Sequence, residues 1–146
     1  MTIGRFCCRQ VDTAALDETV QAAAQRMGNR GVGTLVVTDA SNRPAGILTD
    51  RDIVVRAVGA RRDPASMSVG DTMTSDVHTA FEDMATEDAL KLMRTESVRR
   101  LVVVRHDGSL VGIVSLDDIL IRLSDEMREV GDLVRTEAPE GVLAAN

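Results

Sequence analysis

Apolar and polar residues follow one another along the chain in a pattern that predicts a small mixed unit. Val20, Ala23 and Met27 are spaced as on one face of a helix. Two apolar strands follow at Thr34–Thr38 and Ala45–Thr49, with a polar turn between them. The complete predicted unit consists of an extended segment at 8–13, a helix opening near 16, these two strands and a second helix at 53–58.

The same pattern returns after a shift of 66 residues, without a gap. A second extended segment is predicted at 77–80, a helix opening at 86, strands at 101–105 and 110–115 around the turn at 106–109, and a helix from 119. Identical residues fall on core and turn positions, among them the pairs Val11/Val77, Thr13/Thr79, Met27/Met93, Val32/Val98, Leu35/Leu101, Gly46/Gly112, Asp52/Asp118 and Arg56/Arg122. The chain is therefore predicted to be an internal duplication.

Each copy contains the same corner between its last strand and its second helix. Thr49 and Asp52 form this corner in the first copy, and Ser115 and Asp118 form it in the second. A hydroxyl residue followed three places later by an acid is typical of a helix capping box, which stabilises by about 1 kcal/mol. The same groups suit a nucleoside phosphate, because helix N-termini bind phosphate and an aspartate accepts hydrogen bonds from ribose hydroxyls. Spacing alone favours capping, and both interpretations stay open.

Composition and charge argue against some classes of function. A net charge of -6 argues against nucleic-acid or anionic-membrane binding, which needs a basic face. No apolar run approaches the length of about 20 residues that crosses a bilayer, and a signal-peptide core is lacking, so a cytoplasmic protein is expected. The two aromatic residues, Phe6 and Phe81, leave the core to aliphatic side chains.

The few residues suited to catalysis or metal binding are isolated. Cys7 and Cys8 are adjacent, which disfavours a disulfide between them, and we expect one to fill the core while the other points away. His78 and His106 stand alone, so no metal site and no nucleophile–base pair is predicted. We therefore expect no enzyme activity. A redox sensor built on the two cysteines remains an alternative function.

The repeated corner and strand pair resemble the cystathionine-β-synthase (CBS) domain over residues 7–124, and the tandem resembles a stand-alone CBS pair, or Bateman module. The resemblance implies an α/β (α+β) fold of two β-α-β-β-α repeats packed sheet to sheet with pseudo-twofold symmetry. The corresponding organisation is a first repeat at 7–60, a linker with a short helical turn at 61–76, a second repeat at 77–124, and a helical extension with a frayed tail at 125–146.

The resemblance also implies a non-catalytic regulatory module that binds an adenosine ligand (AMP, ADP, ATP or S-adenosylmethionine) in clefts between the repeats and acts as a homodimer. No cofactor is required, and an unidentified protein could be its regulatory target. The implied roles are ribose binding by Asp52 and Asp118, phosphate binding by Thr49 and Ser115, base contacts near Thr13 and Thr79, and an apolar wall from Val32 and Val98.

The two clefts are expected to differ in phosphate affinity. Arg51 lies in the first corner, with Arg61 and Arg62 nearby in sequence. In the second corner, Asp117 beside Asp118 repels phosphate unless Arg99 and Arg100 compensate. We therefore expect the Thr49/Asp52 site to bind a phosphorylated ligand more tightly.

The end of the chain predicts a further helix. Apolar residues at spacings of three and four continue from Leu123 to Val134. This stripe fits either a partner helix or packing against its own repeat, and the sequence favours neither. A ligand-free scaffold that dimerises through this helix is therefore a further alternative function.

Overall fold

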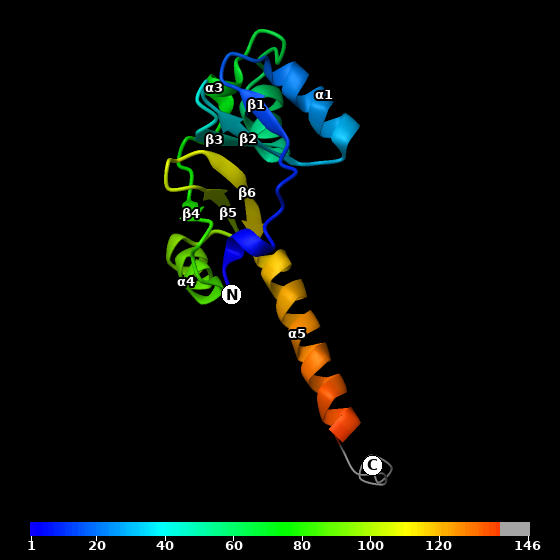
Figure 1. The fold of residues 1–146 in the computed structure, drawn as a ribbon. Coiled ribbons are helices and arrows are strands. Elements are labelled where there is room, and N and C mark those ends of the chain that lie inside the picture. The colour runs from blue at the N-terminus through cyan, green and yellow to red at the C-terminus, as the bar shows by residue number, and fades with distance from the viewer. Residues whose placement is uncertain (138–146) are drawn as a thin grey trace.

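Each half of the chain folds around a three-stranded sheet, as the computed structural model of residues 1–137 shows (Figure 1). In the first repeat, β1 (Thr13–Ala15) runs parallel to β2 (Thr34–Thr38), which pairs antiparallel with β3 (Pro44–Thr49). The second repeat has the same order and directions in β4 (Thr79–Phe81), β5 (Arg100–Val104) and β6 (Leu110–Ser115). Both β1 and β4 lie slightly later in the chain than the predicted extended segments, and their register with the next strand begins at the threonine.

Helices connect and cover these strands. The first repeat contains α1 (Val20–Arg30) and α2 (Asp50–Ile53), which continues as the π-helical turn η2 (Val54–Val58). The second contains α4 (Thr86–Glu96) and the long α5 (Leu116–Glu137). Two short helices precede the repeats, η1 (Ile3–Arg5) and α3 (Val69–Thr72), the latter inside the predicted linker. The predicted frayed tail at 138–146 lies outside the described residues.

The two sheets face each other across a shared apolar layer. Val36 of β2 packs in one cluster with Val102 and Val104 of β5. The neighbouring strand residues Leu35 and Leu101 point to the opposite faces and pack in the cores beneath the helices. Because both faces of each central strand are covered, the strands are apolar without alternation. The structure confirms the predicted mixed fold of two packed repeats.

The short segments that precede the repeats are exchanged between them. Ile3 of η1 is fully buried in the core of the second repeat, and Val69 of α3 is fully buried in the core of the first. Figure 1 shows the N-terminus beside α4 before the chain crosses to β1. Each repeat is therefore completed by a segment that lies next to the other repeat in sequence.

The exchanged segments cross the sheets at the two repeated glycines. Cys8 and Ile113 exchange two backbone hydrogen bonds, and Thr74 and Ile47 do the same in the first repeat. A Cβ on Gly112 would lie 2.4 Å from the carbonyl oxygen of Cys8. Glycine is therefore required here by the close approach of a second backbone.

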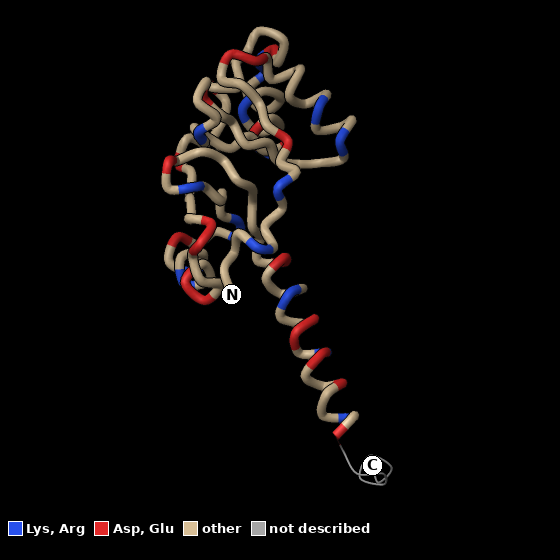
Figure 2. Tube along the Cα trace, in the orientation of Figure 1, with Lys and Arg blue, Asp and Glu red and all other residues tan. Residues whose placement is uncertain are grey.

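Helix α5 leaves the body of the molecule as a single rod (Figure 1). Ile119 at its base is fully buried, and seven further apolar side chains are 41% to 71% exposed: Leu120, Ile121, Leu123, Met127, Val130, Leu133 and Val134. Acidic and basic residues are interleaved along the same rod (Figure 2). Of the two packing arrangements that the sequence left open, the structure does not show the helix folding back on its own repeat.

Candidate functional site

A cleft of about 360 Å³ opens between the two repeats at the corner where β3 meets α2. The first repeat contributes Thr49 and Asp52, and the second contributes Arg99 and Arg100. The remaining lining residues are Thr34, Ile47, Thr74, Asp76, His78, Val98, Val102 and Ile113. The cleft thus combines an apolar wall, a hydroxyl, carboxylates and basic side chains, a composition suited to a small polar ligand.

The corner of the first repeat is a complete capping box. The Thr49 hydroxyl accepts a hydrogen bond from the Asp52 amide at 3.1 Å, and one Asp52 oxygen accepts from the Thr49 amide at 3.0 Å. The other Asp52 oxygen lies 3.5 Å from both the Thr74 hydroxyl and the Arg56 guanidinium. Because these contacts are long, this second oxygen of a cleft-lining carboxylate can accept shorter hydrogen bonds from a ligand.

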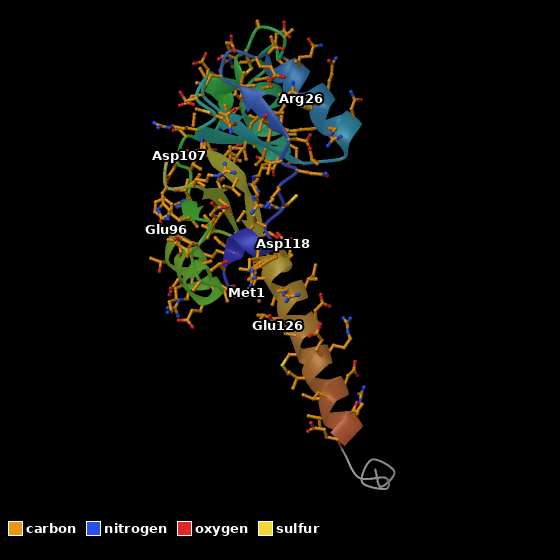
Figure 3. All side chains as sticks on the ribbon, in the orientation of Figure 1. Met1, Arg26, Glu96, Asp107, Asp118 and Glu126 are labelled. Atoms are coloured by element: carbon orange, nitrogen blue, oxygen red, sulfur yellow. The ribbon has the colours of Figure 1, made fainter. Side chains whose placement is uncertain are left out.

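The corner of the second repeat has the same cap in a different setting. Asp118 accepts hydrogen bonds from the Ser115 amide at 2.8 Å and from the Ser115 hydroxyl at 2.6 Å. Arg122 is the residue equivalent to Arg56, and it pairs with Glu126 further along α5. Figure 3 shows Asp118 where α5 begins. Capping is therefore seen at both corners, and the first corner also lines the cleft, so ligand binding there stays a prediction.

A second, smaller cleft of about 270 Å³ is related to the first by the internal repeat. Its lining residues are Cys8, Gln10, Val11, Asp12, Val32, Gly33, Thr34, Arg100 and Ile113. Shifting the first cleft by 66 residues reproduces most of this set, with Cys8 for Thr74, Asp12 for His78 and Gly33 for Arg99. Ser115 and Asp118 do not line it. The clefts are equivalent in position and unequal in chemistry.

The structure gathers only some of the predicted site residues. Thr49, Asp52, Val98 and Arg99 line the first cleft, and Val32 lines the second. Outside both lie Thr13, Arg51, Thr79, Ser115 and Asp118. The threonines are displaced because β1 and β4 start there, so that the residue before each one, Asp12 or His78, is the one at the cleft.

The predicted distribution of arginines differs from the observed one. Arg51 is exposed on α2, and its backbone amide bonds to Asp50. Arg99 and Arg100, assigned from sequence to the second corner, both line the Asp52 cleft. Arg99 also reaches Asp117 at 3.1 Å. The packing of one sheet on the other places the start of β5 opposite the first corner. This contact between repeats cannot be predicted from the distance between the residues in the sequence.

His78, Thr74 and Asp76 are cleft residues that the sequence analysis did not identify. His78 lies 3.4 Å from Glu96 and 3.8 Å from Asp76. The internal repeat could have pointed to them, because they precede β4 just as residues 8–12 precede β1 in the first repeat. Their position in the cleft depends on the exchange of the lead-in segments.

The cysteines are separated as predicted. Cys7 is buried in the core of the second repeat, and burial raises the pKa of its thiol. Cys8 is exposed, and its thiol faces the Gln10 carbonyl oxygen at 3.7 Å. The raised pKa makes Cys7 a poor nucleophile in the folded protein.

Within residues 1–137, no cluster of three His, Cys, Asp or Glu side chains is arranged to hold a metal ion. A search of the described helices for one long and apolar enough to cross a membrane finds none.

Comparison with known proteins gives a consistent result. The model of the CBS domain matches twice, at residues 3–59 and 69–125, so the exchanged segments belong to the repeats. An uncharacterized protein of Methanopyrus kandleri is 36% identical over 120 residues, which are 82% of this chain and 61% of that protein's length. This chain therefore spans about three fifths of that relative.

Two solved structures extend the comparison. Hypoxic response protein I, solved with two coordinated zinc ions, is 31% identical with a TM-score of 0.73 and covers 82% of this chain and 97% of its own. The Mycobacterium tuberculosis hypoxic response protein 1 is 33% identical over 108 residues, 74% of this chain and 75% of that protein. A CBS domain protein from Pyrobaculum aerophilum, solved in complex with AMP, is 26% identical with a TM-score of 0.72 and covers 86% of this chain and 99% of its own.

Proposed function

Since this chain belongs to the CBS domain family and carries two copies of that domain, we propose that it is a non-catalytic regulatory module that binds an adenosine nucleotide in the Asp52 cleft. The observation that supports this most is the composition of the cleft. A ribose-type acceptor, Asp52, and a hydroxyl, Thr49, from one repeat face Arg99 and Arg100 from the other. The AMP complex of the Pyrobaculum aerophilum relative supports this choice of ligand class.

The charges of the cleft favour a phosphorylated ligand over S-adenosylmethionine. Arg99 and Arg100 both line the cleft, where a phosphate gains charge-assisted hydrogen bonds from a guanidinium. A sulfonium cation would be repelled by the same groups. Among the adenosine ligands we therefore propose AMP, ADP or ATP for this site.

Two matched substitutions separate ligand binding from helix capping. Asp52→Ala and Asp118→Ala each remove the acid of a capping box, so each should lower the free energy of unfolding by about 1 kcal/mol. Only Asp52 lines the first cleft. A hydrogen bond to a charged group is worth about 1.5–3 kcal/mol, so Asp52→Ala should weaken AMP binding about ten- to hundred-fold.

The measurement is calorimetric titration with AMP and with adenosine, on both variants and the unsubstituted protein. Asp52→Ala should weaken both ligands, because both carry the ribose, and Asp118→Ala should leave the binding to the first cleft unchanged. Equal losses in the two variants would contradict the assignment of the site. A protein that binds neither compound would refute the proposed function.

We also infer that the module acts as a homodimer through α5. Leu120, Leu123, Met127, Val130 and Val134 follow one another at alternating spacings of three and four and are exposed. This spacing is typical of the seam of a coiled coil, and such a seam can be self-complementary about a twofold axis. A second copy of this chain is therefore the partner that fits the stripe.

A further inference from the structure

Three residues line both clefts, namely Thr34, Arg100 and the apolar Ile113, and the two polar ones decide the charge that the clefts share. Thr34 begins β2 and Arg100 begins β5, and these positions are equivalent in the internal repeat. Each of them pairs in register with the hydroxyl residue of its own corner, Thr49 or Ser115. Of these two equivalent positions, only position 100 carries a cationic side chain. A fully symmetric pair of repeats would have a cation at both positions or at neither.

Arg100 is the basic group of the first cleft that is free to bind an anion. Arg99 donates to Asp117 at 3.1 Å, and His78 lies 3.4 Å from Glu96. Within residues 1–137, Arg100 forms no side-chain hydrogen bond or ion pair with a protein group. A phosphate in this cleft can therefore bind the Arg100 guanidinium without breaking an existing ion pair.

The second cleft depends on the same side chain. Where the first cleft has Arg99 and His78, the second has Gly33 and Asp12. Among the described residues that line it, Arg100 is the one basic residue. Asp12 is held by Arg30 at 2.8 Å, and its carboxylate adds negative charge beside the cleft. A phosphate there has no cation other than Arg100 to bind among the lining residues.

We propose that Arg100 is a shared phosphate ligand that limits the protein to one tightly bound nucleotide per chain. This inference rests on the proposed nucleotide function and adds to it the coupling of the two clefts. A phosphate bound in the first cleft holds the guanidinium and leaves the second cleft without a basic lining residue. Binding in one cleft then weakens phosphate binding in the other, and this coupling is reciprocal.

The test uses AMP and adenosine, which differ by the phosphate, and two substitutions that restore symmetry at the centre. Arg100→Thr places at position 100 the residue found at 34, and it should weaken AMP binding about ten-fold or more while adenosine affinity stays unchanged. Thr34→Arg supplies the second cation, and it should raise the stoichiometry from one to two AMP molecules per chain. Calorimetric titration measures affinity and stoichiometry together, and urea unfolding confirms that each variant is folded.

The possible outcomes separate this inference from the proposed function. If Arg100→Thr weakens AMP and adenosine equally, or neither, Arg100 is not a phosphate ligand, although the nucleotide site stands. If the unsubstituted protein binds two AMP molecules with equal affinity, the exclusion is wrong. If neither AMP nor adenosine binds, the proposed function fails together with the inference.

Discussion

Replacing Gly112 by alanine tests whether the N-terminal segment crosses β6 as described. The new Cβ would lie 2.4 Å from the Cys8 carbonyl oxygen and 3.1 Å from the Cys7 sulfur. Both are closer than atoms in proteins normally approach, so the segment must move. Moving it breaks the two backbone hydrogen bonds between Cys8 and Ile113, at 2.8 and 3.0 Å.

The cost follows from these contacts. Each hydrogen bond contributes about 0.5–1.5 kcal/mol, and overpacking adds about 1–3 kcal/mol. Gly112→Ala should therefore lower the free energy of unfolding by about 2–6 kcal/mol, measured by urea denaturation. Gly28→Ala in α1 is the matched control, since nothing lies within 4 Å of its new Cβ. This control should stabilise the protein by about 0.5–1 kcal/mol, because alanine is the better helix former.

A thiol assay shows whether the damage is local. In a Cys8→Ser background, Cys7 is the remaining thiol, buried and with a raised pKa, so it should react slowly with alkylating reagents. Adding Gly112→Ala should expose Cys7 and speed the reaction. A loss of stability below about 0.5 kcal/mol, with Cys7 still protected, would refute the crossing of this segment over β6.

Two other predictions concern the helices. The Thr19 hydroxyl caps α1 by accepting from the Ala22 amide at 3.1 Å, whereas the equivalent Ala85 provides no side-chain cap for α4. Ala85→Ser should raise the free energy of unfolding by about 0.5–1 kcal/mol and Thr19→Ala should lower it by about 1 kcal/mol, and unchanged urea midpoints would contradict the capping argument. Val130→Glu on the exposed stripe of α5 should convert the inferred dimer to a monomer in light scattering without changing AMP affinity, whereas Glu129→Lys beside the stripe should not. A dimer that survives Val130→Glu would exclude the stripe as the interface.

The sequence carries most of the information about the fold of each repeat. The repeated glycines, the strand pairs and the two capping boxes are local features, and local chemistry determines them. The exchange of the lead-in segments was not predicted, because Ile3 and Val69 are similar in chemistry but not identical. Their equivalence becomes visible only when both are seen buried in each other's repeat.

The candidate site was predictable to the extent that it belongs to one repeat. Thr49 and Asp52 form a local corner, so their spacing in the sequence was enough to identify them. Arg99 and Arg100 reach the same cleft from the other repeat, by way of the packing of two sheets. In the sequence, both arginines belong to the same repeat as Ser115, and Arg100 does pair in register with Ser115. Nothing in the sequence indicates that they also face the first repeat across the two sheets.

The position of α5 gives the second corner a mechanical consequence. The helix starts at Leu116, directly after Ser115, and continues for 22 residues to Glu137. At a rise of about 1.5 Å per residue, the helix is about 33 Å long. A tilt of about 10° at its base would carry its far end through about 6 Å, a distance greater than one helical turn. A small change in the backbone at Asp118, in the first turn of the helix, would thus produce a larger displacement at the far end of α5.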